Sequence, residues 1–336
     1  MNNGGTADQF YIRKYPHGSL SILHYLFYIN HHPSVLLPPY LRPGDTIGVV
    51  SPASWFPYDE LADGLRILRD DWQLKVIEGD SLHAVDGPFA GSDDLRRADL
   101  QRLFDNSDVR AVFAARGGYG CYRIADGLDL TGLRANPKWL VGFSDVTVLL
   151  SLLYNHGIVS LHGLMPRQFG QPNRAESLES LRQWLFGEGP TQYSVPDNRL
   201  NRPGQAAGLL VGGNLTMLAN SLGTLTDVDF SGIILFIEDI DETLFSLDRM
   251  MTQLHRAGRL ANLAGLVVGQ FTDMRVNLSL PFGKNANEII AEAVADYHYP
   301  VLFDFPAGHV DYNLALPIGM SVRLVVDSER GTLDFM

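Results

Sequence analysis

Short apolar runs alternate with longer amphipathic segments along most of the chain. Three of these runs end in polar or turn-forming residues, as is typical of buried parallel strands; they lie at residues 46–50, 111–115 and 139–143. After the first run, Leu61, Leu65 and Leu68 recur at helical spacing and give one apolar face. A helical pattern at 145–156 ends at Gly157. This alternation predicts βαβ units and a mostly parallel sheet covered by helices.

The same alternation resumes after a polar, turn-rich stretch at residues 167–207, which we predict to be a linker. Beyond it, apolar runs typical of strands lie at residues 208–211, 233–237, 263–268 and 301–303, with helical patterns at 214–222, 244–257 and 285–297. Residues 321–335 have the strand, turn and strand of a hairpin. We therefore predict an N-terminal doubly wound, flavodoxin-like α/β domain over 37–166 and a smaller mixed α/β domain over 208–336.

Residues 1–36 lack this pattern and are interpreted as a leader or extension. Their apolar run at 20–29 is shorter than the roughly 18 residues that a membrane span requires. Although basic residues precede the run, as in a signal peptide, it contains His24 and is not followed by a small-residue cleavage site. We expect no membrane span and a cytoplasmic protein, with secretion as the alternative.

Composition narrows the possible partners. Hydrophobic residues make up 46% of the chain and charged residues 19%, which favours buried cores over global disorder. The formal charge of −12 should repel phosphate backbones, so nucleic acid is not an expected partner. Cys121 is the sole cysteine, which excludes an intramolecular disulfide and fits a reducing compartment.

Polar clusters follow four of the predicted strands, at residues 116–120, 142–145, 238–242 and 308–309. Ligands of open α/β sheets bind beyond the carboxyl ends of strands, so these clusters are the candidate site. Ser144 has the local arrangement of a nucleophile elbow, two residues after Gly142 and just before a helix. Val146 occupies the position of the usual second glycine, and a serine before a helix can instead be an N-cap.

A serine nucleophile needs a base and a group that orients the base. His309 follows a predicted strand through a turn, without a helix of its own, although a lone histidine is often structural. Glu238 ends an apolar strand, where a carboxylate is costly to bury unless it is paired. The alternatives for the acidic run at 238–242 are a solvated turn that caps the next helix and a metal site, for which no nearby His or Cys is present.

The glycine-rich loop at 116–120 lacks the spacing of a nucleotide-binding motif. We expect it to form an oxyanion hole, with the amides of Gly118 and Asp145 facing the developing negative charge. Arg116 and Gly117 of this loop are candidates for substrate binding. Gly213 and Asn214 could also line the substrate cleft, with tight helix packing as their alternative role.

Seven short motifs occur in order along the chain: Leu41-Arg-Pro-Gly-Asp45, Val49-Val-Ser-Pro52, Arg116-Gly-Gly-Tyr-Gly120, Gly142-Phe-Ser-Asp145, Gly212-Gly-Asn-Leu215, Glu238-Asp239 and Gly308-His309. Together they resemble the LD-carboxypeptidase family of serine peptidases, also called muramoyltetrapeptide carboxypeptidases. The resemblance implies Ser144 as nucleophile, His309 as general base and Glu238 as the residue that orients it. It also implies a homodimer and hydrolysis without metal or cofactor.

In that family the bond cut joins an L-configured centre of diaminopimelate or lysine to a terminal D-alanine, during peptidoglycan recycling in the cytosol. The expected partner is therefore a small peptide, the murein tetrapeptide. One branch of the family resembles microcin-immunity peptidases that cut aminoacyl-nucleotide toxins, and this remains an alternative. The alternative from another class is a non-catalytic protein whose two lobes close on a small molecule.

Overall fold

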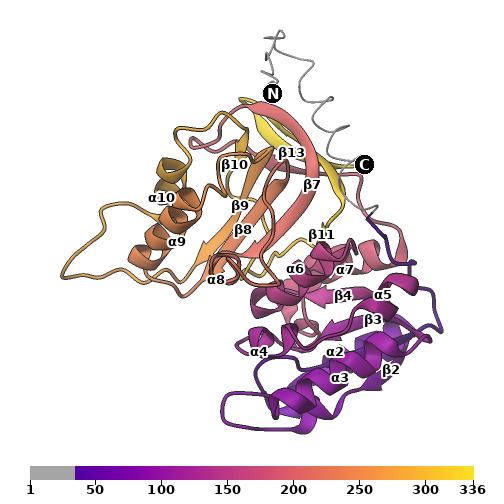
Figure 1. Ribbon diagram of the computed structural model, residues 1–336. Helices are drawn as coiled ribbons and strands as arrows, with labels where there is room; N and C mark the ends of the chain where they lie inside the picture. Colours follow the sequence, from indigo (N-terminus) through magenta and orange to yellow (C-terminus); the bar gives the residue numbers. More distant parts are fainter. Residues whose placement is uncertain (1–34) are drawn as a thin grey trace, which may run out of the picture.

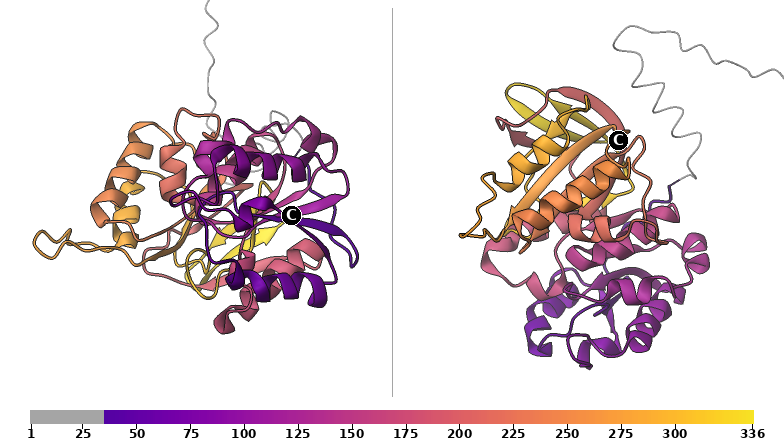
Figure 2. Two further views of the ribbon diagram at one scale, coloured as in Figure 1. Left: turned by 90° about the horizontal axis from the view of Figure 1, so that it is seen from below. Right: turned by 60° about the vertical axis from the view of Figure 1, so that its left-hand side comes forward.

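Two β-sheets form the framework of the computed structural model, which describes residues 35–336 (Figure 1). The predicted leader therefore lies almost wholly outside the described residues. Each sheet belongs to one lobe, and the right view of Figure 2 shows the N-terminal lobe in indigo to magenta below the C-terminal lobe in orange to yellow. Within the described part of the chain, no helix is both long and apolar enough to cross a bilayer.

The first sheet has the strand order β11-β5-β4-β3-β1-β2. Its strands are β1 (Thr46–Val50), β2 (Lys75–Glu78), β3 (Val109–Ala114), β4 (Trp139–Gly142), β5 (Ser160–His162) and β11 (Leu316–Ile318). β1 to β5 pair in parallel, and β11 runs antiparallel to β5. The order 2-1-3-4-5 is that of flavodoxin-like folds, which confirms the predicted fold class and its three predicted strands.

Helices lie on both sides of this sheet, as the left view of Figure 2 shows. They are η1 (Tyr58–Leu61), α2 (Ala62–Arg66), η2 (Ile67–Asp71), η3 (Asp80–His83), α3 (Asp93–Asp105), α4 (Cys121–Ala125), α5 (Thr131–Ala135), η4 (Ser144–Val146) and α6 (Thr147–Asn155). The predicted leucine face is buried, since Leu61, Leu65 and Leu68 are at most 4% exposed. α6 ends before Gly157, whose φ of 69° glycine adopts without steric cost.

The stretch predicted as a linker contains regular structure. It holds η5 (Pro166–Gln168), η6 (Pro172–Arg174), α7 (Ala175–Phe186) and β6 (Gln192–Pro196). α7 buries Leu181 and Leu185 in the apolar core of the first sheet, whereas β6 pairs with a strand of the second sheet. The polar turns that suggested a linker lie between these elements, so this stretch contributes to both domains.

The second sheet has the order β10-β9-β8-β7-β12-β13-β6. Its other strands are β7 (Gly204–Asn214), β8 (Ile234–Ile240), β9 (Gly265–Thr272), β10 (Val301–Leu302), β12 (Ser321–Val326) and β13 (Arg330–Phe335), and its helices are α8 (Leu215–Asn220), α9 (Leu244–Arg256) and α10 (Ala286–Ala293). β7 to β10 pair in parallel, and β12 and β13 form the predicted hairpin. The sheet has both parallel and antiparallel pairs, and with its helices it forms the α/β domain that was predicted.

The two domains share an apolar core. α6 of the first domain packs against β7 and α8 of the second, and one cluster of buried side chains includes Leu149 of α6 and Leu210 of β7. The chain also returns late in the sequence to add β11 to the first sheet. These contacts fix the lobes against each other and bring the polar ends of strands from both domains to one boundary.

Candidate active site

Ser144 lies at the sharp turn that follows β4, as the first residue of η4. Its φ is 63°, a left-handed conformation that is uncommon for a non-glycine residue and is found at strained functional turns. The turn is tightly packed: a Cβ at Gly117 would lie 3.2 Å from the Ser144 Cβ. The side chain of Ser144 caps no helix and has no hydrogen-bond partner among residues 35–336. The N-cap alternative is therefore wrong, and the hydroxyl is available.

His309 and Glu238 form a hydrogen-bonded pair. The Nδ1 atom of His309 lies 2.7 Å from Oε2 of Glu238, whose side chain is fully buried, while His309 is 16% exposed. Burial opposes a charge on the imidazole, but the adjacent Glu238 carboxylate and its hydrogen bond outweigh burial and raise the pKa of His309 above its ordinary value. Because Nδ1 is engaged, Nε2 is the ring nitrogen left for a reacting group.

The first part of the acidic run, Glu238 and Asp239, is buried, whereas Asp241 is exposed. Asp239 is 2% exposed and accepts hydrogen bonds from Asn214 Nδ2 and Thr216 N, at 2.8 and 2.9 Å. Burial, with repulsion from Glu238, raises the pKa of Asp239 to about 6. Within residues 35–336 no cluster of side chains suits a metal ion. The run instead presents one carboxylate to His309 and uses the next to fix the start of α8.

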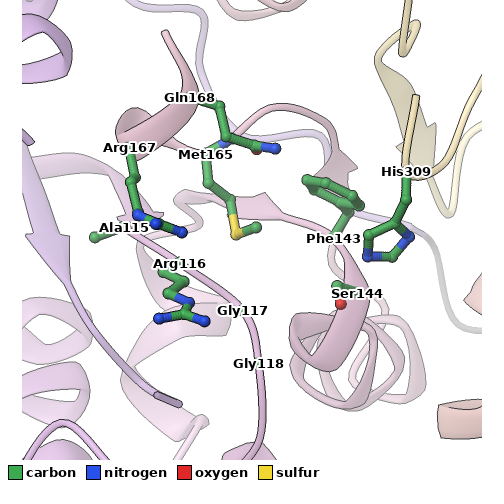
Figure 3. A pocket seen from close by; sticks show the side chains of 10 residues that line it. All are labelled: Ala115, Arg116, Gly117, Gly118, Phe143, Ser144, Met165, Arg167, Gln168 and His309. Atoms are coloured by element: carbon green, nitrogen blue, oxygen red, sulfur yellow. The ribbon is translucent and has the colours of Figure 1, made fainter. Parts of the chain in front are cut away.

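Ser144 and His309 open onto the same pocket, which has a volume of about 220 Å³. Its lining residues are Ala115, Arg116, Gly117, Gly118, Phe143, Ser144, Met165, Arg167, Gln168 and His309. Figure 3 shows the His309 ring beside Ser144 on one side of the pocket and the two arginines on the other. The structure thus brings together the side chains predicted from three separate strand ends, from both domains.

The glycine-rich loop is fixed against the Ser144 turn. The buried guanidinium of Arg96 donates from Nη1 to the carbonyls of Pro52 and Gly120, at 2.7 and 3.0 Å. Oδ2 of Asp145 accepts a 2.8 Å hydrogen bond from the amide of Cys121, directly after the loop. Burial raises the pKa of Asp145. Arg96 lies in α3, where its neighbours in the sequence are those of a surface arginine. Its burial could therefore not be predicted from the sequence.

Gly118 has a free backbone donor within this loop. Its φ is 109°, and a Cβ there would lie 2.4 Å from the Ser54 hydroxyl, so only glycine fits. The loop around it is held by the amide of Tyr119, which donates to Ser54 Oγ at 3.1 Å. Among the described residues the Gly118 amide donates to no acceptor. A donor left free beside a candidate nucleophile is suited to receive an oxyanion.

The segment that carries His309 is held by η6 and the start of α7. Arg174 donates to the carbonyl of Val310 at 2.9 Å, and the hydroxyl of Ser177 donates to the carbonyl of Asp311 at 2.8 Å. On the other side, Gly308 packs so closely on Glu238 that a Cβ would lie 3.0 Å from its carboxylate. These positioning contacts come from the stretch predicted as a linker, and they could not be inferred from spacing in the sequence.

Gly213 and Asn214 do not line this pocket. A Cβ at Gly213 would lie 2.6 Å from the hydroxyl of Thr147, so this glycine allows β7 to approach α6. Asn214 is 4% exposed, caps α8 through Met217 N and also bonds to Asp239. In this structure both residues have the packing role that was the alternative to substrate binding. By contrast, Arg116, Gly117 and Gly118 do line the pocket, together with Arg167, Met165 and Gln168, which the sequence did not single out.

Comparison with known proteins agrees with this geometry. The family model for the LD-carboxypeptidase N-terminal domain matches residues 47–163, and that for the LD-carboxypeptidase C-terminal domain matches residues 207–324. The chain is 35% identical to the "Probable murein peptide carboxypeptidase" of Bacillus subtilis, over 89% of this chain and 93% of that one. It is 33% identical to the murein tetrapeptide carboxypeptidase of Pseudomonas aeruginosa, over 83% and 92%.

A solved structure has the same architecture. The crystal structure of muramoyltetrapeptide carboxypeptidase from Oxalobacter formigenes matches with a TM-score of 0.77 and 30% identity, covering 86% of this chain and 98% of that one. Both family models match in the expected order, and their residues include all three side chains of the Ser144, Glu238 and His309 cluster. The chain belongs to the LD-carboxypeptidase family.

Proposed function

We propose that the protein is a serine-type carboxypeptidase that hydrolyses the LD-peptide bond before the terminal D-alanine of murein tetrapeptides. The observation that carries this proposal is the buried Glu238–His309 pair beside a serine that has a strained backbone and a free hydroxyl. Family membership supports the reaction type, and the carboxypeptidase names of the relatives support the substrate class. A homodimer in the cytoplasm stays a prediction from the sequence.

In the proposed mechanism, Ser144 Oγ attacks the scissile carbonyl while Nε2 of His309 accepts the hydroxyl proton. The buried carboxylate of Glu238 stabilises the imidazolium that forms. The amides of Gly118 and Asp145 donate to the oxyanion of the tetrahedral intermediate. His309 then gives its proton to the departing amine of D-alanine, and the same imidazole activates the water that hydrolyses the acyl-enzyme. This scheme uses only groups of the chain and requires no metal ion or cofactor.

The substrate proposal predicts stereospecific release of alanine. We expect the protein to release D-alanine from an LD-tetrapeptide that contains diaminopimelate or lysine, and to leave the LL-isomer intact. Mass measurement of the products over time checks this, with the Ser144→Ala variant as the control for contaminating peptidases. No release from the LD-peptide, or equal release from both isomers, would overturn the proposed specificity.

The same assay separates the rival functions. Cleavage of an aminoacyl-nucleotide analogue, without cleavage of the LD-tetrapeptide, would assign the protein to the microcin-immunity type of activity. A non-catalytic binding protein would bind the peptide and release no product from either substrate. The Glu238–His309 pair beside Ser144 favours hydrolysis over that last role, because binding alone does not require a buried carboxylate that raises the pKa of a neighbouring histidine.

A further inference from the structure

Arg116 is a pocket cation without an acidic partner among residues 35–336. Its Nη1 donates to the carbonyl of Trp55 at 2.7 Å, and no carboxylate of the described chain forms an ion pair with it. The other arginine of the pocket, Arg167, forms a salt bridge with Glu60. Glu60 also attracts Arg116, but it forms its salt bridge with Arg167 and none with Arg116. Arg116 therefore presents its remaining guanidinium donors to whatever fills the pocket.

The surroundings of Arg116 favour an anion. Its side chain is partly buried, and burial followed by repulsion from Arg167 lowers the pKa of its guanidinium. A guanidinium remains protonated in proteins even so, and an anion between the two arginines would relieve both effects. Figure 3 shows both guanidinium groups on the side of the pocket opposite Ser144 and His309. A ligand that lies across the pocket would thus meet a nucleophile at one end and positive charge at the other.

The rest of the pocket suits a small residue with an apolar side chain. Ala115, Phe143 and Met165 line it and are buried. Gln168 uses its Oε1 to accept a hydrogen bond from Met165 N, and its Nε2 has no partner in the described part of the chain. The pocket thus offers an apolar surface for a small side chain such as a methyl group. It also offers the free amide donor of Gln168 and the guanidinium of Arg116.

We propose that Arg116 binds the terminal carboxylate of the substrate, with Arg167 beside it, and so makes the enzyme select a free C-terminus. This inference rests on the proposed function, because it identifies the group bound as the carboxylate of the departing D-alanine. A guanidinium can hold a carboxylate through two parallel charge-assisted hydrogen bonds, which fixes both orientation and distance to the nucleophile. Arg116 is then a specificity residue, because it selects the last peptide bond of the peptide substrate.

The test is a binding measurement in the Ser144→Ala background, where the ligand is not consumed. The protein is titrated calorimetrically with an LD-tetrapeptide that ends in D-alanine, once as the free acid and once as the C-terminal amide. We expect the acid to bind about 10 to 100 times more tightly than the amide, the range for one hydrogen-bonded charge. Adding Arg116→Gln should reduce that ratio to about 1 by weakening the acid alone.

Two matched variants separate this role from a structural one. Arg66→Gln removes an exposed arginine that pairs with Asp71 on the same domain, and it should leave the ratio unchanged. Arg116→Lys keeps the charge without the planar fork, and it should restore part of the preference for the acid. A general loss of folding would weaken both ligands equally, whereas loss of a carboxylate contact changes only the ratio.

The outcomes distinguish this inference from the proposed function. The carboxylate site is overturned if the Ser144→Ala protein binds acid and amide equally or binds neither. It is also overturned if the preference for the acid persists after Arg116→Gln. Neither conclusion depends on whether the native protein cleaves the LD-peptide. If the preference exists and depends on Arg116 while the native protein releases no alanine, the carboxylate site stands and the proposed hydrolysis fails.

Discussion

Replacing Ser144 by alanine is expected to lower kcat for D-alanine release by about 10⁴- to 10⁶-fold, the range for loss of a triad nucleophile. The hydroxyl has no hydrogen-bond partner among residues 35–336, so its removal leaves no polar group unpaired. The free energy of unfolding should therefore change by no more than about 0.5 kcal/mol. Single-turnover kinetics with the LD-tetrapeptide, together with thermal unfolding, measures both quantities.

Two further variants sharpen this prediction. Ser144→Gly should be equally inactive and at least as stable as Ser144→Ala, because glycine adopts a φ of 63° without the steric penalty. Ser107→Ala removes an exposed hydroxyl elsewhere in the same domain and should retain full activity. A Ser144→Ala protein that turns over at a near-normal rate would contradict the assignment of the nucleophile.

Glu238→Gln should lower kcat by about 10³- to 10⁴-fold, because the amide keeps the shape of the carboxylate but removes its charge. In the native protein Glu238 raises the pKa of His309, so activity should rise with pH through a value above the ordinary histidine pKa of about 6.5. Without the carboxylate charge, burial of the imidazole dominates and lowers its pKa. The acidic limb of the kcat/KM profile should then move to lower pH, although the maximum rate falls.

Glu242→Gln is the matched control for this prediction. Glu242 belongs to the same acidic run but is partly exposed, and its Oε1 accepts a hydrogen bond from Thr216 rather than from His309. Its replacement should change neither the maximum rate nor the position of the acidic limb. A Glu238→Gln protein with native kcat, or with an acidic limb that moves to higher pH, would show that Glu238 does not hold the imidazolium.

The fold class, and the meeting of Ser144, Glu238 and His309 at one place, could be predicted from the sequence for one physical reason. Parallel strands are short, continuous apolar runs, so the polar residue that ends each run is conspicuous. Ser144, Glu238 and His309 each follow or end such a run, and side chains at strand ends of α/β folds gather at one edge. The rule places each residue at an edge, but it does not say that edges of two domains face each other.

The supporting residues could not be predicted in this way, because their roles depend on contacts distant in sequence. Arg96 has the pattern of a surface arginine, and only the structure shows it buried with carbonyls of two separate loops as acceptors. β11 lies near the end of the chain but joins the first sheet. Gly213 and Asn214 have the composition of a ligand loop, yet close packing of α6 on β7 uses them instead.

Active-site labelling tests the central claim most directly, because it reports whether Ser144 is activated by His309. The native protein is incubated with a serine-directed phosphonylating probe, and the labelled peptide is identified by mass spectrometry. The account predicts a single label at Ser144, formed quickly in the native protein and lost in His309→Ala. A native protein that is not labelled at Ser144, or a label that forms equally well without His309, would contradict it.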